Sequence, residues 1–179
     1  MMRISRIKRF QFLLLDTGPI IKLFELGIWD EFITKCDVAI SRIVAEQAQY
    51  ASQEFEDICI NLGSYEGKNL IKIFEVELSE VKAFHEKFDL QYKVIIHPGE
   101  KETLAFLYNS SENWLVCAAD GAVFRVLGFL SKAEQAISLE EVLEKIGLSR
   151  KLEWKYTKKF CEKYTHMGQI DSIQDKGLL

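Results

Sequence analysis

The sequence predicts an α/β protein with three layers, in which helices cover both faces of a central parallel sheet. Two observations support this prediction. Short segments that are apolar throughout alternate with segments of helical periodicity, and two of the apolar segments, "FLLL" (12–15) and "WLVCAA" (114–119), run into an aspartate. Strands without polar alternation are typical of parallel sheets that are buried on both faces.

The composition is that of one globular domain. The chain has 179 residues, of which 48% are hydrophobic and 28% are charged, enough to bury a core without disulfides or structural metals. No apolar run is long enough to span a membrane, and the N-terminal apolar run is too short for a signal peptide. The four cysteines are scattered without a C-x-x-C pair, so we expect reduced thiols and a cytoplasmic protein without membrane contact.

The elements in the first part of the chain follow from apolar runs and helix signals. "FQFLLL" is expected to form a strand, and Thr17 and Pro19 should begin a helix that Gly27 ends. "DVAIS" should form the next strand, and the periodicity after it predicts a helix. The expected ranges are a strand at 10–15, a helix at 18–26, a strand at 37–41 and a helix at 42–52.

The same signals predict a helical second half. The expected elements are strands at 70–76 and 114–120 and helices at 78–88, 98–109, 121–130, 138–148 and 150–164. We interpret residues 1–179 as one domain. It comprises a motif-bearing core at about 11–130, a helical C-terminal extension at about 131–165 and a loosely held polar tail at 166–179.

Several acidic residues stand where a parallel sheet would bring them together. Asp16 and Asp120 end strands, Glu46 lies on the helix after the second strand, and Glu100 and Glu102 begin a later helix. Functional residues gather beyond the carboxyl ends of such strands. Asp16 could instead cap its helix, Asp120 could be a turn residue and Glu46 a solvated one.

Crowded carboxylates repel one another, and a divalent cation would relieve that repulsion. Oxygen ligands suit Mg²⁺ or Mn²⁺, and a metal-held water can attack a phosphodiester bond. Glu100 and Glu102 point in different directions on a helix, so only one of them can face the site. We interpret His97 as a structural residue.

The segments "LLLDTGPIIKL", "ISRIVAEQ", "GEKETLAFL" and "VCAADGAVFR" stand in the order and rough spacing of PIN-domain motifs, and residues 11–130 resemble that family. The resemblance implies an α/β/α fold and a metal-dependent endoribonuclease. Its metal-binding and catalytic acids would be Asp16, Glu46, Glu102 and Asp120. Thr17, which we expect mainly to cap its helix and secondarily to contact a metal-bound water, matches the hydroxyl residue after the first acid. Glu100 would interact with its own helix N-terminus.

The chain departs from the family pattern in ways that leave a second interpretation open. Its third motif reads E-T-L-A, Ala122 stands where many members carry a polar or acidic residue, and the chain continues well past the motifs. The leading hypothesis is an enzyme, with an antitoxin protein and a second copy of the chain open as partners. The alternative is a PIN-like binding or regulatory module with weak or lost catalysis.

Basic residues are concentrated near both ends of the sequence. Residues 1–10 hold four bases and no acid, and residues 149–163 hold six bases and two acids. On a helix, Lys155, Lys159 and Lys163 would form a stripe beside an apolar row. A solvated face is the simple interpretation; the functional one is that this stripe and the N-terminal bases contact RNA phosphates.

Overall fold

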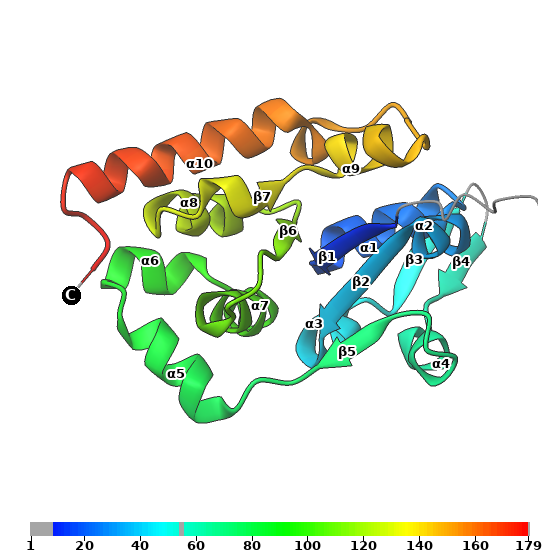
Figure 1. Cartoon of the computed structure of the whole chain (residues 1–179), viewed down its shortest axis with the longest axis horizontal. Coiled ribbons are helices and arrows are strands. Elements are labelled where there is room, and N and C mark those ends of the chain that lie inside the picture. Colours follow the sequence, from blue (N-terminus) through cyan, green and yellow to red (C-terminus); the bar gives the residue numbers. More distant parts are fainter. Residues whose placement is uncertain (1–8, 54–55, 179) are drawn as a thin grey trace, which may run out of the picture.

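A parallel sheet of five strands forms the centre of the computed structural model, which describes residues 9–53 and 56–178 (Figure 1). In spatial order the strands are β5 (Lys72–Phe74), β2 (Cys36–Ser41), β1 (Phe10–Leu15), β6 (Leu115–Cys117) and β7 (Ala136–Ile137). All neighbouring pairs are parallel. This confirms the predicted α/β class and the parallel sheet.

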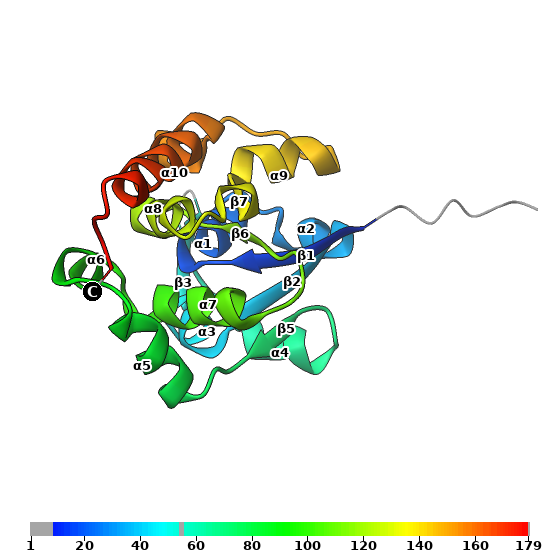
Figure 2. The same ribbon diagram turned by 60° about the vertical axis from the view of Figure 1, so that its left-hand side comes forward.

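Two separate hydrophobic clusters show that helices cover both faces of the sheet. Leu13 and Leu15 of β1 belong to one cluster, and Leu14 belongs to the other. The first cluster includes α1 (Thr17–Glu25), α2 (Trp29–Lys35), α3 (Arg42–Gln47), α4 (Leu62–Gly67) and α9 (Leu139–Ile146). The second includes α5 (Leu78–Glu86), α6 (Leu90–Ile95), α7 (Pro98–Asn109), α8 (Gly121–Phe129) and α10 (Lys158–Ile173). The arrangement is compatible with a three-layer sandwich (Figures 1 and 2).

The helix predicted at 42–52 is too long. Only α3 is helical there, and the chain then forms an antiparallel hairpin of β3 (Tyr50–Gln53) and β4 (Glu56–Cys59). After Ala48 the side chains no longer follow a helical period, because Tyr50 is exposed while Ala51 is buried against the core. The prediction failed because the alanines in this segment fit either periodicity.

The basic segment is also divided differently from the prediction. Residues Trp154–Tyr156 form a 3₁₀ turn, and α10 begins only at Lys158, where the hydroxyl of Thr157 accepts a hydrogen bond from the Phe160 amide. A threonine cap of this kind stabilises a helix start that periodicity alone does not reveal.

The segment predicted as a loose tail is folded. Helix α10 continues to Ile173, and the buried Asp171 accepts hydrogen bonds from Tyr92 and Arg125, each at 2.7 Å. Further on, the amide of Gly177 donates to the Asp89 carboxylate at 3.0 Å. These contacts fasten the C-terminal helix to α6 and α8. None of the helices in the described residues has the length and apolar character needed to cross a membrane.

Helices α8 and α10 lie side by side because glycines allow their backbones to approach closely (Figures 1 and 2). A Cβ atom at Gly168 would collide with the Arg125 carbonyl, and one at Gly128 would collide with the Thr165 carbonyl. Both obstacles are backbone atoms, which cannot rotate away. The crossing therefore requires glycine at both positions.

We expect Gly168→Ala to lower the free energy of unfolding by about 3 kcal/mol, since overpacking against backbone forces the helices apart. Gly67→Ala is the matched control, because nothing lies within 4 Å of a Cβ atom there; it should leave stability unchanged or slightly raised. Urea denaturation of the two variants measures the difference. Equal stabilities would contradict the close crossing.

Candidate functional site

Adjacent strands bring Asp16 and Asp120 to the same edge of the sheet. Leu15, at the end of β1, pairs with Cys117, at the end of β6, and the Asp16 amide donates to the Cys117 carbonyl at 3.0 Å. Asp120 follows β6 after two alanines and precedes α8. Because neighbouring parallel strands end at the same edge of a sheet, the two carboxylates lie near each other although they are distant in the sequence. The charge of Asp120 therefore affects the ionisation of Asp16.

Asp16 stands at the N-cap position of α1, but its side chain makes no capping hydrogen bond. It is only 9% exposed. Burial raises the pKa of Asp16 to about 6, and the charge of Asp120 adds to the increase, while a backbone hydrogen bond from Thr17 opposes it. The carboxylate is therefore held in a costly environment without acting as a cap, which favours a role in chemistry or binding.

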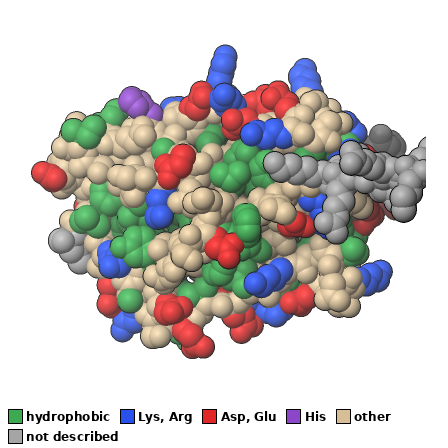
Figure 3. All heavy atoms as spheres, viewed as in Figure 1, with side chains coloured by type: hydrophobic (Ala, Val, Ile, Leu, Met, Phe, Trp, Pro, Cys, Tyr) green, Lys and Arg blue, Asp and Glu red, His purple; other side chains and the backbone are tan. Residues whose placement is uncertain are grey.

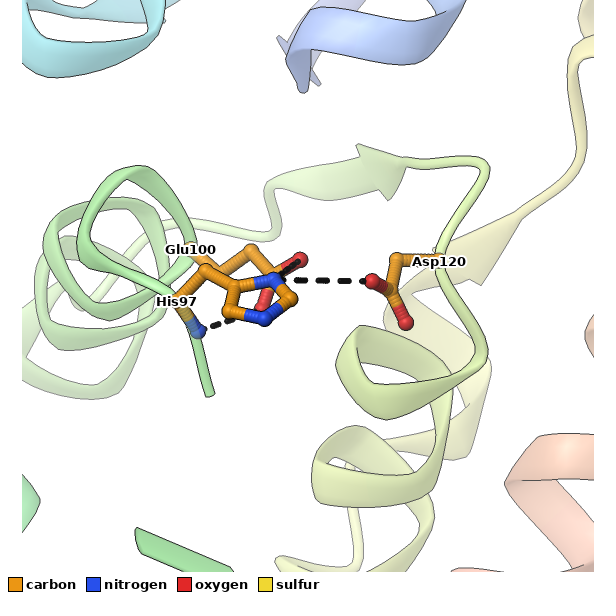
Figure 4. A group of neighbouring side chains, drawn as sticks. All are labelled: His97, Glu100 and Asp120. Carbon is orange, nitrogen blue, oxygen red and sulfur yellow. Dashed lines mark hydrogen bonds and ion pairs between the residues drawn. The ribbon is translucent and has the colours of Figure 1, made fainter. Parts of the chain in front are cut away.

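Asp120 does act as a cap, yet part of its carboxylate remains available. Its Oδ1 accepts a hydrogen bond from the Ala122 amide at 2.8 Å, at the start of α8. Its Oδ2 lies 3.8 Å from Nδ1 of His97. In Figure 4 dashed lines join Nδ1 of His97 to both the Glu100 and the Asp120 carboxylates. The capping and functional interpretations of Asp120 are thus compatible.

Glu100 is the third carboxylate at this edge. It is 5% exposed, and its Oε2 accepts a hydrogen bond from the His97 amide at 2.8 Å, as expected for a residue that interacts with its own helix N-terminus. Burial raises the pKa of Glu100 to about 8, and Asp120 and Asp16 contribute, against the opposing hydrogen bond from His97. One ligand atom each from His97, Glu100 and Asp120 lie within 4.8 Å of one another.

Glu102 does not face this edge of the sheet. This differs from the expectation that Glu102, and not Glu100, would face the site. Its Oε2 accepts from the Ile43 amide and its Oε1 from the Val76 amide, both at 3.1 Å, and the residue is 4% exposed. Both oxygens therefore join α7 to the start of α3 and to the segment after β5. Glu102 has a structural position, and Glu100 takes the place that was expected for it.

Thr17 and Glu46 also differ from the expectations. Thr17 is the first residue of α1 rather than its cap, and its hydroxyl donates to Oε1 of Gln47 at 3.2 Å. Glu46 is exposed on α3, and within the described residues no side-chain contact joins it to the three crowded carboxylates. Gln47, which the sequence analysis overlooked, is the α3 side chain that reaches α1 and Gly99 of α7.

His97, interpreted from the sequence as a structural residue, is the N-cap of α7, and its side chain also faces the carboxylates. Its side chain is 65% exposed, and its Nδ1 lies 3.5 Å from Glu100 and 3.8 Å from Asp120. The signal that could have found it is its position immediately before Pro98, because an N-cap residue of a helix that begins at the sheet edge must lie at that edge.

The predicted lysine stripe is only partly formed. Lys159 and Lys163 are exposed on α10, but Lys155 lies on the preceding 3₁₀ turn, where its ammonium sits 5.2 Å from the ring centre of Tyr156. Along the upper edge in Figure 3, where Figure 1 has α10, basic side chains are interspersed with acidic ones. Of the N-terminal bases, Arg9 pairs with Asp37 at 2.9 Å; Arg3, Arg6 and Lys8 lie outside the described residues.

The chemistry of the donor set fits a divalent cation. Three helices, α1, α7 and α8, begin beside the carboxylates, and the positive ends of their dipoles offset part of the negative charge. Burial nevertheless raises the pKa values of Asp16 and Glu100, and the charges of neighbouring carboxylates add to the increase. Carboxylate oxygens suit Mg²⁺ or Mn²⁺, and the imidazole of His97 adds a nitrogen donor that Mn²⁺ or Zn²⁺ accepts more readily than Mg²⁺ does.

Comparison with known protein families, curated proteins and solved structures finds no match for the chain.

We expect substitution by glutamine to lower the stability of the protein at Glu102 but not at Glu100, although both residues lie on α7. Glu102→Gln places an amide donor against a backbone donor, so it should lower the free energy of unfolding by about 1–3 kcal/mol. Glu100→Gln retains an acceptor for the His97 amide and is neutral, as a carboxyl with a pKa of about 8 mostly is at neutral pH, so the fold should persist. Chemical denaturation of both variants in the presence of a chelator compares their free energies of unfolding. A loss of stability in Glu100→Gln equal to that in Glu102→Gln would contradict these assignments.

The metal-free protein should lose stability as the pH rises from about 4 to about 8. A carboxyl whose pKa is higher in the folded state binds its proton more tightly in that state, and this binding stabilises the fold. The stabilisation is present below the pKa of the unfolded state and is lost as the pH rises through the pKa of the folded state. For Asp16 that range runs from 3.8 to about 6, and for Glu100 from 4.5 to about 8. Asp16→Asn should flatten the lower part of this dependence.

Thermal melts in a chelator across this pH range provide the measurement. Glu112→Gln, which alters an exposed acid, is the control and should keep the wild-type profile. A wild-type stability that rises between pH 5 and 8 would contradict the crowding of the carboxylates.

Proposed function

We propose that the chain is a Mg²⁺- or Mn²⁺-dependent endoribonuclease of PIN type that hydrolyses RNA phosphodiester bonds. The observation that carries the proposal is the cluster of His97, Glu100 and Asp120 at the carboxyl edge of β1 and β6. Asp16 lies near enough for its charge to contribute to the raised pKa of Glu100. Carboxylates that ionise reluctantly are tolerated where a cation completes the site.

The order of the motifs on the fold also supports the proposal. Asp16 follows β1, the "RIVAEQ" segment follows β2 directly, and Asp120 follows β6, so each motif stands beyond the carboxyl end of a strand of one sheet. Glu100 reaches the same edge from the start of α7. The PIN-like identity of the fold is part of this proposal.

In the proposed enzyme, Asp16, Glu100 and Asp120 hold the cation. A bound divalent cation supplies a water of lowered pKa and offsets negative charge on the phosphate. The backbone amides of His97 and Ala122 orient the carboxylates of Glu100 and Asp120. His97 directs Nδ1 at these carboxylates, so its outer nitrogen, Nε2, is placed to exchange a proton with a leaving oxygen. The role of Glu46 as a metal-binding and catalytic acid stays a prediction.

The proposed partners follow from the proposed activity. RNA is the substrate, and Lys159 and Lys163 on α10 could contact its phosphates. If the enzyme is a toxin, an antitoxin protein would block this edge of the sheet. A second copy of the chain is a further proposed partner.

One observation favours the alternative of a binding or regulatory module. Ala122 contributes only its backbone amide, which donates to one oxygen of Asp120. The methyl side chain of Ala122 cannot bind a second cation. A module of this kind would bind RNA or a protein without cutting it.

The test is cleavage of a labelled single-stranded RNA in Mg²⁺ or Mn²⁺, together with thermal melts in each metal. We expect wild-type cleavage to be lost in a chelator and reduced by at least about 100-fold in Asp16→Asn and Glu100→Gln. Millimolar Mn²⁺ should raise the wild-type melting temperature and leave that of Asp16→Asn nearly unchanged.

Glu86→Gln, which alters an exposed acid of α5, is the control and should retain full activity. Activity that persists in Asp16→Asn would refute the assignment of the metal site. Metal stabilisation of the wild type without any RNA cleavage would favour the binding module.

A further inference from the structure

A pocket of about 400 Å³ opens directly beside the carboxylates. His97 and Asp120 form one side of it, and the remaining wall consists of Val94, Ile95, Gly121, Ala122, Arg125 and Tyr164. Its volume lies within the range of pockets that hold small ligands, roughly 300 to 1,000 Å³. Because the pocket shares two residues with the candidate site, a group bound in it would be continuous with a group bound at the carboxylates.

The C-terminal helix supplies the outer wall of this pocket. Tyr164 of α10 packs on the first residue of α8, where a Cβ atom at Gly121 would lie 2.5 Å from the ring. Phe160 supports the ring from the same helix, with ring centres 4.7 Å apart. The tyrosine is therefore held in place, and within the described part of the chain its hydroxyl has no hydrogen-bond partner.

Arg125 contributes a positive group with spare donors. Its Nε and Nη2 both contact a single oxygen of Asp171 at 2.7 Å, and its guanidinium lies 5.3 Å from the ring centre of Tyr92. The Arg125 side chain also contacts the Tyr92 hydroxyl, but a guanidinium carries five N–H donors, more than these contacts use. A guanidinium fixed in this way keeps its orientation and can still donate to an anion in the pocket.

The charges around the pocket distinguish it from the carboxylate site. Lys163 lies next to Tyr164, with its ammonium 5.5 Å from the ring centre, so the wall formed by α10 carries positive charge. Asp120, next to the glycine that this ring covers, supplies negative charge to the same pocket. This distribution of charge suits a ligand with one anionic group near the α10 wall and a second anionic group that binds the cation at the carboxylates. Two successive phosphates of one strand are such a ligand.

We propose that this pocket binds the phosphate of the nucleotide next to the bond that is cut, so that the enzyme acts on single-stranded polynucleotide and not on a single nucleotide. The inference rests on the proposed function and deepens it. The hydroxyl of Tyr164 and the guanidinium of Arg125 donate to that phosphate, while the next phosphate lies at Asp16, Glu100 and Asp120. The C-terminal extension is thereby part of the substrate site.

The experiment compares Tyr164→Phe with the wild type. This substitution keeps the ring packed on Gly121 and removes only the hydroxyl. We measure the Kd for a fluorescent single-stranded RNA by anisotropy in Ca²⁺, chosen to limit turnover, and then single-turnover cleavage in Mn²⁺. The Kd should rise about tenfold, because a hydrogen bond to a charged group is lost, while the maximal cleavage rate stays within about twofold.

A second measurement identifies the phosphate. RNAs that carry one neutral methylphosphonate, placed in turn at each linkage beside the cleavage site, should reveal one position that weakens wild-type binding about tenfold. That penalty should disappear in Tyr164→Phe and shrink in Arg125→Lys, which keeps a cation for Asp171. The inference would be overturned if the loss of affinity from the methylphosphonate and the loss from the protein substitution simply added together when both changes are present.

The control is Tyr108→Phe, which removes a tyrosine hydroxyl on α7 that lies outside this pocket. RNA binding and cleavage that are the same in Tyr164→Phe as in the wild type would overturn the pocket inference and leave the ribonuclease proposal standing. RNA binding that depends on Tyr164 without cleavage would overturn the ribonuclease proposal and retain the pocket as an RNA site. A wild type that does not bind RNA would overturn both.

Discussion

Three carboxylates are crowded at the edge where β1 and β6 end, and the surrounding structure is arranged to tolerate them. At a separation of about 4 Å two such charges repel by roughly 4 kcal/mol at an effective dielectric near 20. The fold reduces this repulsion without removing it. Backbone amides donate to Glu100 and Asp120, and three helix N-termini face the cluster, yet burial keeps two carboxyls reluctant to ionise.

The close spacing depends on backbone approaches that only small residues permit. Gly18 meets the Cβ of Ala119, which would lie 2.7 Å from an added methyl group, so α1 can begin directly against the segment after β6. Gly99 lies against the side chains of Gln47 and Val44, and this contact joins the starts of α7 and α3. A larger side chain at Gly18 would push the start of α1 away from Ala119, and with it Asp16 away from Asp120. The geometry of the site is therefore a property of backbone packing as much as of its acids.

Much of this could be predicted from the sequence, for reasons that the structure explains. Apolar runs that end in Asp16 and Asp120 fix the strands and also fix which edge the aspartates share. Helical periodicity correctly separated Glu100 from Glu102 but could not say which one faces the site, because both are buried on opposite sides of α7. That choice depends on how α7 is rotated against the sheet, which is determined by tertiary contacts that periodicity does not encode.

The hairpin after α3 and the folded C-terminal segment were missed for a related reason. Residues 48–53 have weak local preferences, and residues 166–178 are largely polar, so neither segment carries a strong pattern. Their structures come from distant partners, such as Tyr92 and Arg125 for Asp171. Long-range polar contacts of this kind have no local signature in the sequence.

The close crossing of α8 and α10 has a consequence for how the protein is made. Helix α8 leaves the ribosome well before α10, so its glycine-lined face stays uncovered and the wall at Tyr164 is missing while synthesis continues. Until α10 has folded against α8, the pocket beside His97 and Asp120 therefore lacks the side that Tyr164 forms.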